Sequence, residues 1–217
     1  CIAFICNRSL PEVENDTRTP LRRYLHATRA RARALGFELE LFNVAEAGMT
    51  PQRLTKILVA RGIGGAVFHP MDEGGGLVGL PIEPEPFSLV MIEHVFIEPR
   101  LHKVCDDQFS TIGRMLQRLL DYGYARTGIA MSVRADEHAN HHWLAGYQAY
   151  QAMCEPAQRV PHLITPDWTK ATFLAWFRRW RPDAIVTIDE DIVLWLREAG
   201  VRVPEDVACT TLYWKED

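Results

Sequence analysis

The chain has 217 residues with 24 Lys plus Arg and 28 Asp plus Glu, so its formal net charge is −4 at pH 7. Hydrophobic residues make up 47% and charged residues 24%, ordinary proportions for a globular chain that exclude disordered and fibrous classes. No apolar run reaches the ~20 residues of a membrane-spanning helix, and the first residues lack a secretion signal. We therefore expect a cytoplasmic protein with no membrane partner, folded as one large or two small domains.

The cysteines and the charge exclude further classes. Five cysteines are spread along the chain without a Cys-x-x-Cys pair, so neither a disulfide framework nor a zinc site is expected. A negative net charge without a basic, aromatic-rich stripe argues against nucleic-acid binding by these residues themselves. The chain starts with Cys1 inside an apolar run instead of with Met, and we expect it to be a piece of a longer protein.

The first half alternates apolar strand-like runs with helical patterns. Leu21, Leu25 and Ala32 recur at helical spacing, Gly36 is a typical residue after a helix end, and Thr50-Pro51 is a typical helix start. The predicted strands are residues 2–6, 37–41, 65–68 and 88–92. The predicted helices are residues 21–35 and 50–61. Loops are expected at residues 7–20, 71–86 and 95–102, where Pro, Gly, Asn or Asp interrupt the patterns.

The second half repeats this alternation. Its predicted helices are residues 110–122, 140–153, 170–180 and 192–199. Its predicted strands are residues 128–132, 184–188 and 207–212. Strands separated by helices imply parallel sheets with right-handed crossovers, hence an α/β fold. We expect two Rossmann-like lobes, residues 1–103 and 104–217, joined near residues 103–108.

Polar side chains follow most of the predicted strands. Ligands of open parallel sheets bind beyond the carboxyl ends of the strands, so these positions are candidates for binding. If the two halves face each other, the candidates line one cleft, whereas each taken singly is equally compatible with a solvated loop residue. The candidates are Asn7, Arg8, Ser9, His69, Met71, Glu93, His94, Arg134, Asp189, Glu190 and Tyr213.

Several motifs resemble those of the LacI/GalR family of transcription regulators. The most distinctive is the run Gly-Val-Arg-Val-Pro-Glu-Asp-Val at residues 200–207. The others are Val-Cys-Asp-Asp-Gln at 104–108, Leu-Asp-Tyr-Gly-Tyr at 120–124, Gly-Tyr at 146–147, Arg-Pro-Asp-Ala-Ile-Val at 181–186 and Arg-Gly-Ile-Gly-Gly-Ala-Val-Phe at 61–68. The resemblance covers nearly the whole chain.

The resemblance implies a two-lobed effector-binding core with a periplasmic-binding-protein-like fold of type I, closing on a small carbohydrate-like molecule between the lobes. It also implies a homodimer and a helix-turn-helix headpiece that reads operator DNA. None of this chain matches that headpiece, and the last family segment, which returns to the first lobe, is also missing, so we expect a core truncated at both ends. The resemblance implies no cofactor, no metal and no catalytic residues.

This sequence departs from the family at positions that usually contact the effector. Trp143 replaces an Arg three residues before the Gly-Tyr pair, Asp189-Glu190 stands where Asn-Asp is usual, and Tyr213 replaces an acidic residue. Such aromatic rings either stack on a sugar or aromatic ligand, or fill a pocket that has lost its ligand. The expected ligand contacts are His69, Glu93, Arg134, Trp143, Asp189 and Tyr213.

Other clusters favour plainer interpretations. His138 and His142 are four residues apart, but Asn140 is a candidate N-cap that would leave His138 outside the helix, so a solvated turn is favoured over a metal site. The glycines at 74–76 lack the Lys-Ser/Thr of a phosphate loop. The arginines at 22–33 are expected on a solvated or dimer-contacting helix face. The alternative function is an exported solute-binding protein of a transport system, and an enzyme is the least favoured class.

Overall fold

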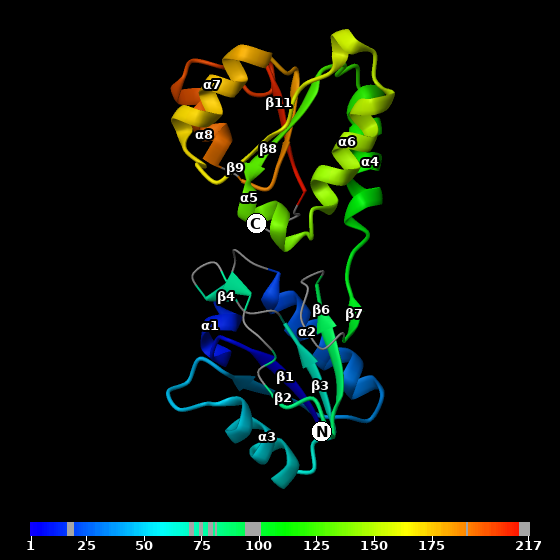
Figure 1. Ribbon diagram of the computed structural model, residues 1–217, viewed down its shortest axis with the longest axis vertical. Coiled ribbons are helices and arrows are strands. Elements are labelled where there is room, and N and C mark those ends of the chain that lie inside the picture. The colour runs from blue at the N-terminus through cyan, green and yellow to red at the C-terminus, as the bar shows by residue number, and fades with distance from the viewer. Residues whose placement is uncertain are drawn as a thin grey trace. The chain divides into compact units, whose positions relative to one another are not determined.

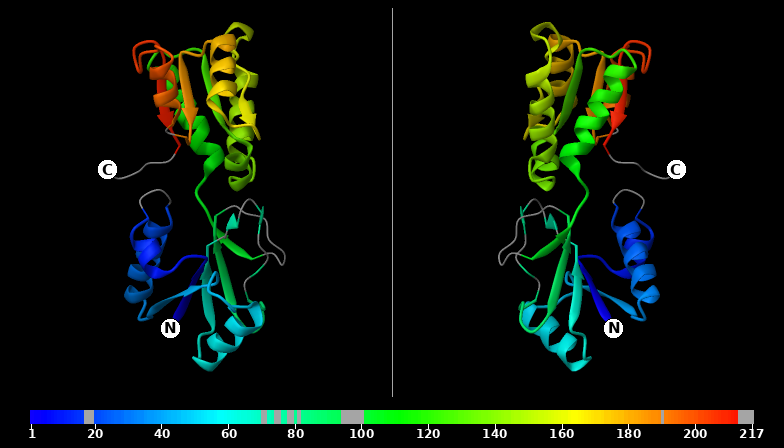
Figure 2. Two further views of the ribbon diagram at one scale, coloured as in Figure 1. Left: turned by 90° about the vertical axis from the view of Figure 1, so that its left-hand side faces the viewer. Right: turned by 90° about the vertical axis from the view of Figure 1, so that its right-hand side faces the viewer.

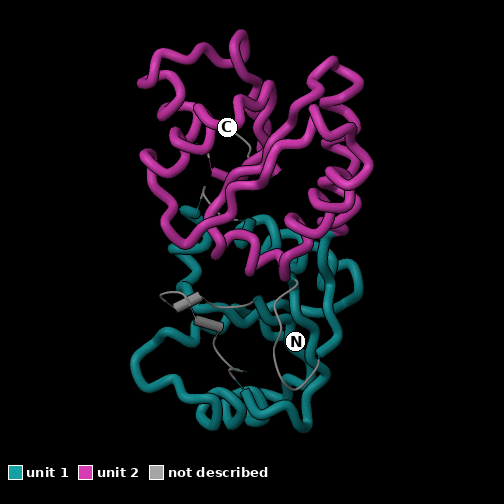
Figure 3. Tube along the Cα trace, turned by 45° about the horizontal axis from the view of Figure 1, so that its top comes forward, with its two compact units in different colours: residues 1–106 teal, residues 107–217 magenta. Residues whose placement is uncertain are grey.

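The computed structural model describes residues 1–16, 20–69, 72–73, 76–77, 80, 82–93, 101–189 and 191–212. The chain forms two compact units, Cys1–Asp106 and Asp107–Asp217, which Figure 3 shows in different colours. The division falls three residues after the expected end of the first lobe at residue 103. Both units contain parallel sheets with helices between the strands, which confirms the predicted α/β class.

The first unit is built on a five-stranded sheet in the order β2-β1-β3-β6-β7, with every neighbouring pair parallel (Figure 1). The strands are β1 (Ile2–Cys6), β2 (Leu39–Asn43), β3 (Gly65–Phe68), β6 (Ser88–Ile92) and β7 (His102–Val104). The helices are α1 (Leu10–Glu14), α2 (Leu21–Ala34) and α3 (Pro51–Ala60). A short antiparallel pair, β4 (Asp72–Glu73) and β5 (Gly76–Leu77), lies outside this sheet.

Both faces are buried in the middle of this sheet, which explains why β1, β3 and β6 have largely apolar sequences. Ala3 and Ile5 of β1 face a core that includes residues of α3, whereas Phe4 and Cys6 face a core that includes residues of α2. Successive side chains of a strand point to opposite faces, so one five-residue strand serves two cores. Helix α3 begins as predicted, with the Thr50 hydroxyl accepting a hydrogen bond of 3.2 Å from the Arg53 N–H.

The second unit is built on a four-stranded parallel sheet in the order β11-β10-β8-β9 (Figure 2). The strands are β8 (Thr127–Ser132), β9 (Leu163–Thr165), β10 (Ala184–Thr187) and β11 (Ala208–Thr211). The helices are α4 (Gln108–Asp121), α5 (Val133–His138), α6 (His142–Met153), α7 (Lys170–Trp180) and α8 (Asp191–Glu198), with a 3-10 turn, η1, at Pro156–Gln158.

Helices cover both faces of this second sheet (Figure 1). Ile129 and Met131 of β8 belong to a core with α4 and α6, while Ala130 belongs to a core with α7 and α8. Tyr147 and Trp143 of α6 are among the largest fully buried side chains of the first of these cores. The arrangement is the doubly wound one that places functional groups at the carboxyl edge of the strands.

Some elements differ from the sequence-based predictions. The predicted loop at 7–20 contains α1, whose start carries a capping box between Ser9 and Glu12 and a Pro in its first turn. Helix α5 and strand β9 were not predicted, and β7 begins within the expected break at 95–102, of which residues 95–100 lie outside the described residues.

The prediction that Asn140 caps a helix is wrong. Asn140 and His141 both have left-handed backbones, with φ of 48° and 61°, and α6 begins only at His142. The cap comes instead from the buried carboxylate of Asp136 on α5, which accepts a hydrogen bond of 3.0 Å from the Leu144 N–H. As expected, His138 lies outside this helix, since it ends α5.

Candidate functional site

Three side chains meet at the carboxyl edge of the first unit's sheet. Glu93 follows β6, His69 follows β3, and Tyr24 lies in the first turn of α2. The Tyr24 hydroxyl donates a hydrogen bond of 3.1 Å to Oε1 of Glu93, and Nε2 of His69 lies 3.9 Å from the same oxygen. The Tyr24 and His69 rings are 5.8 Å apart between centroids. We call these residues the Tyr24–His69–Glu93 cluster.

The side chains of the cluster are mostly buried but keep some surface exposed to solvent. The side chains of His69 and Glu93 are 18% and 15% exposed, so each keeps a limited surface for a ligand. A partly desolvated carboxylate next to an imidazole offers strong hydrogen-bond acceptors and a donor within one small area. This combination suits a ligand with several hydroxyl groups, or one with a single cationic group.

The backbone at Glu93 has a left-handed conformation. Its φ is 91°, in a region of backbone conformation that residues other than glycine rarely adopt. Such a conformation costs on the order of 1–3 kcal/mol and is found preferentially at functional sites. The Glu93 N–H donates a hydrogen bond of 2.9 Å to the Val104 carbonyl, which ties the residue to the end of β7. This bond therefore holds the backbone of Glu93 in place, and the bond from Tyr24 orients its carboxylate.

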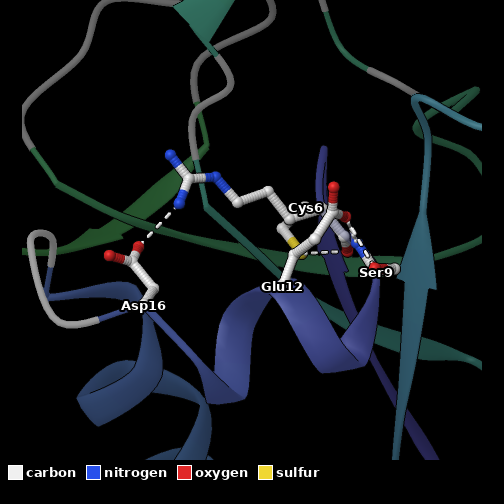
Figure 4. A network of polar contacts seen from close by, with 5 residues as sticks. Cys6, Ser9, Glu12 and Asp16 are labelled. Carbon is white, nitrogen blue, oxygen red and sulfur yellow. Dashed lines mark hydrogen bonds and ion pairs between the residues drawn. The ribbon is translucent and has the colours of Figure 1, made fainter.

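The loop after β1 adds a second polar group at this edge (Figure 4). Arg8, which is 41% exposed, forms an ion pair of 2.7 Å with the nearly buried carboxylate of Asp16. The hydroxyl and the N–H of Ser9 both donate to Glu12, and these bonds lower the pKa of Glu12. Burial raises the pKa of the Cys6 thiol, whose Sγ contacts the Arg8 carbonyl at 3.3 Å. The bonds fix this loop and leave part of Arg8 open to solvent.

At the carboxyl edge of the second unit's sheet, Asp189 follows β10. One of its oxygens accepts a hydrogen bond from Nε1 of Trp168, and the other accepts one of 3.0 Å from the Asp191 N–H at the start of α8. The Thr187 hydroxyl accepts a further bond of 2.9 Å from the Asp189 N–H. Asp189 thus has a fixed orientation, and each carboxylate oxygen retains a lone pair for a ligand.

Arg134 also lies at this edge, two residues after the end of β8. It is an exposed residue of α5, and its carbonyl accepts a hydrogen bond of 2.8 Å from Nδ1 of His138. The Ser132 hydroxyl caps the same helix by accepting a bond of 3.3 Å from the Ala135 N–H. This cap fixes the first residue of α5, and it therefore fixes the position of Arg134 relative to the end of β8.

Trp143 and Tyr213 are the two aromatic residues that stand at positions where the family usually has a polar ligand contact. Trp143 is 0% exposed and belongs to the core between α4, α6 and the sheet, so its ring offers no surface on which a ligand stacks in this structure. Its indole N–H is buried without a hydrogen-bond partner among the described residues. Tyr213 lies outside the described residues.

His141, just before α6, contacts the carboxylate that caps this helix. Nδ1 of His141 lies 2.9 Å from Oδ2 of Asp136, the carboxylate that caps α6. Within the described part of the chain, no group of three or more His, Cys, Asp or Glu side chains is arranged to hold a metal ion. Nor does any helix in that part have the length and apolar composition needed to cross a membrane.

The structure therefore brings together two of the six predicted contacts, His69 and Glu93. Arg134 and Asp189 lie at the carboxyl edge of the other sheet, Trp143 lies in a core, and Tyr213 is outside the described residues. Sequence reasoning did not identify Tyr24 as a site residue, nor Trp168, which orients Asp189. The available signal for Tyr24 was a hydroxyl-bearing ring near the start of α2, the second helix after β1.

The motifs that carry the family resemblance stabilise turns. The Asp183 carboxylate accepts hydrogen bonds of 2.8 and 3.0 Å from the N–H groups of Ala125 and Arg126, just before β8. Asp206 receives the Arg202 guanidinium through Nε at 3.1 Å and Nη2 at 2.6 Å. The guanidinium and the N–H of Arg202 together lower the pKa of Asp206 to about 2. These residues specify the fold and not the ligand.

Comparison with known proteins identifies the fold. No protein-family model matches the chain, and no curated protein matches it. Solved structures do resemble it. A putative LacI-family transcriptional regulator from Rhizobium etli has a TM-score of 0.65 and 15% identity over 96% of this chain and 76% of its own. The transcription regulator CcpA of Lactococcus lactis has a TM-score of 0.63 and 13% identity over 97% of this chain and 77% of its own.

A third similar structure contains a sugar. It is a periplasmic binding protein/LacI transcriptional regulator from Alkaliphilus metalliredigens QYMF, complexed with D-xylulofuranose, with a TM-score of 0.58 and 12% identity over 96% of this chain and 76% of its own. The chain thus has the fold of LacI-type regulators and of periplasmic binding proteins, which confirms the fold that the sequence motifs predicted.

Proposed function

We propose that this chain is the effector-sensing core of a LacI-type transcription regulator that binds a small, polyhydroxylated metabolite. The observation that carries the proposal is the Tyr24–His69–Glu93 cluster at the carboxyl edge of the first unit's sheet. The fold supports the proposal, because similar solved structures are regulators and one of them holds a sugar. The proposal involves no cofactor and no catalytic step.

The chemistry of the cluster favours hydroxyl groups over other ligand groups. A carboxylate such as Glu93 accepts hydrogen bonds from two neighbouring hydroxyls of a sugar, and charge-assisted bonds of this kind are the stronger ones. The His69 imidazole either donates to or accepts from a third hydroxyl, depending on its tautomer. The Tyr24 ring next to them provides an apolar surface for the C–H face of the sugar ring.

The second unit has proposed ligand contacts of its own. Asp189 is oriented by Trp168 and by the N–H of Asp191, so that its remaining lone pairs are preorganised for a ligand. Arg134 provides donors from α5. Tyr213 remains a predicted contact, and Trp143 would support the site from the core instead of stacking on the sugar.

In this proposal the signal is a shift between conformations. A ligand that binds one arrangement of the two units more tightly than another shifts the equilibrium toward it by its difference in affinity. A helix-turn-helix headpiece in a homodimeric cytoplasmic protein would convert that shift into a change in operator affinity. An exported solute-binding protein with the same fold would bind its ligand without any effect on DNA.

Thermal-shift and calorimetric measurements with a panel of pentoses, hexoses and their phosphates test ligand binding. We expect at least one sugar to raise the melting temperature, and Glu93→Gln to weaken its affinity about tenfold or more, as expected when a charged hydrogen-bond acceptor is lost. The matched control is Glu38→Gln, an exposed position of the same unit. If no sugar binds, or if Glu93→Gln binds the sugar as tightly as the wild type, the assigned site is wrong.

The full-length gene product tests the regulatory part separately. We expect it to retard a DNA fragment from its own upstream region in a gel-shift assay, and the sugar identified above to change the apparent affinity. Sugar binding without any DNA binding would support the transport alternative.

A further inference from the structure

A second candidate site lies at the other end of the second unit's strands. An open groove of about 430 Å³ is formed by the C-terminal half of α6, the η1 turn, the segment before β9 and the end of α7. The Tyr147 hydroxyl at its base donates to the carbonyl of Thr127, the first residue of β8, which places the groove at the amino edge of the sheet. Its volume lies within the range of small-molecule sites. Asp189 and Arg134 belong to the opposite edge.

Several hydrogen-bond donors in the groove have no acceptor among the described residues. Arg159 uses Nε and Nη2 to bind the carbonyls of Cys154 and Ala152, at 3.0 and 3.4 Å, and so caps the end of α6. Its Nη1 group, the His162 imidazole and the Trp180 indole N–H have no partner among the described residues. Arginine has five donors in a planar fork, so a carboxylate can bind the side that the helix leaves unused.

The charged residues that line the groove are basic. No acidic residue is among those that line it. Arg126 binds the carbonyl of Trp180 through Nη2 at 2.7 Å, and the Arg179 guanidinium lies 5.0 Å from the centroid of the Trp180 ring. The C-terminal ends of α6 and α7 each contribute only about half a negative charge, against a full positive charge on each guanidinium. The nearby acid Asp183 is already bound to two backbone N–H groups.

The apolar surfaces of the groove are flat. The lining of the groove includes the partly buried Trp180 ring, Pro156, Pro161 and the exposed Gln148 of α6. Planar rings gain dispersion and stacking energy against such surfaces, whereas flexible chains lose more rotamer freedom on binding. Flat apolar walls and a positively charged rim together select a planar anion.

We propose that this groove binds a small aromatic carboxylate, with its ring against Trp180 and the prolines and its carboxylate toward Arg159 and His162. No covalent step is involved. The site is separate from the Tyr24–His69–Glu93 cluster and independent of the proposed sugar ligand, so the absence of binding here leaves the sensing proposal untouched, and the reverse also holds.

Calorimetry with benzoate and with indole-3-acetate as probes tests the proposal, using the whole chain. Indole-3-acetamide removes the charge of the probe, and cyclohexanecarboxylate removes its planarity. We expect both aromatic acids to bind, and both altered probes to bind about fivefold or more weakly. The result that overturns the proposal is the absence of binding by both acids up to about 10 mM, the weak end of ligand affinity, or equal binding of the amide and the acid.

Two variants locate the binding. Gln148→Glu adds a negative charge at the rim without altering a buried residue, and we expect it to weaken both aromatic acids about fivefold or more. Gln52→Glu, an exposed glutamine of α3 in the first unit, is the matched control and should leave binding unchanged. In ¹H–¹⁵N spectra, the indole signal absent from Trp180→Phe should be the one that moves on titration. Binding that is unchanged in Gln148→Glu, or that leaves this signal unmoved, overturns the assignment to the groove.

Discussion

A methyl group added at Gly146 of α6 would overlap Cγ2 of Ile112 on α4. It would also stand 3.0 Å from the Phe109 carbonyl, so the backbone of one helix lies directly against the other. The Gly-Tyr pair of the family motif therefore has a packing role at its first position. We expect Gly146→Ala to destabilise the protein by about 1–3 kcal/mol, the usual cost of overfilling a packed core, as measured by urea unfolding.

The control for this variant is Gly113→Ala on α4. A Cβ at Gly113 would meet no atom within 4 Å. Alanine is the better helix former by about 1 kcal/mol, so this variant should be as stable as the wild type or more stable. Equal effects of the two substitutions would show that helix propensity and not the α4–α6 contact governs Gly146.

The left-handed backbone of Glu93 predicts an inverted preference between alanine and glycine. Both Glu93→Ala and Glu93→Gly remove the carboxylate and its bond to Tyr24, so the difference between them isolates the backbone. With φ at 91°, the glycine variant should be the more stable of the two by about 1 kcal/mol. At Lys56, an exposed position inside α3, the order should be reversed. If alanine is the more stable residue at both positions, the backbone at Glu93 is not strained.

The hydroxyl of Tyr147 predicts a loss of stability in Tyr147→Phe. It contacts the carbonyls of Thr127, at 3.1 Å, and Val160, and both lie in the interior. Removing the donor leaves buried acceptors with fewer partners, so we expect a loss of about 1–3 kcal/mol in urea unfolding at neutral pH. Tyr122→Phe, at a position 69% exposed, should change stability by less than about 0.5 kcal/mol. A similar loss in both variants would contradict the assigned role.

Tyr147 also predicts part of the loss of protein stability at alkaline pH. Burial raises the pKa of Tyr147 far above its usual value. The stability that it contributes is therefore complete below the pKa of the unfolded chain, about 10, and is lost as pH rises above that value. The wild type should lose more stability than Tyr147→Phe between about pH 9 and pH 11, as followed by unfolding in urea. Identical slopes in the two proteins would assign the alkaline loss to other groups.

The ion pair between Arg202 and Asp206 predicts the opposite pH dependence. Hydrogen bonds from Arg202 hold the pKa of Asp206 at about 2 in the folded protein. Its contribution is complete above the unfolded pKa of about 4 and is lost as pH falls toward 2. The melting temperatures of the wild type and Asp206→Asn should thus differ at pH 5 and converge toward pH 2, whereas Glu205→Gln should run parallel to the wild type. A constant difference for Asp206→Asn would contradict this.

Local patterns were sufficient to predict the central strands of both sheets, because strands such as β1, β8 and β10 bury both faces and therefore read as short apolar runs. Strand β1 is the clearest case, with Phe4 and Cys6 in one core and Ala3 and Ile5 in the other. Short elements were missed because few residues signal them. The start of α1 did carry a Ser-x-x-Glu box at Ser9, yet the surrounding Pro, Asn and Asp outweighed it.

The site was predictable only in part, since sequence places residues at strand ends but does not pair them. His69 and Glu93 were found because both follow strands of one parallel sheet. Tyr24 was missed because its partner is 69 residues away along the chain. The position of Trp143 depends on how closely α6 approaches α4, which the spacing of residues along one helix does not reveal.

Strand β8 connects the two edges at which we place ligands in the second unit. It begins at Thr127, beside the groove, and ends at Ser132, where α5 and Arg134 start. Six residues of extended chain measure about 20 Å, so two small molecules would occupy its ends without touching. If either one altered the affinity for the other, the effect would have to be equal in both directions. A competition experiment between a sugar and an aromatic acid would therefore measure long-range communication and not steric exclusion.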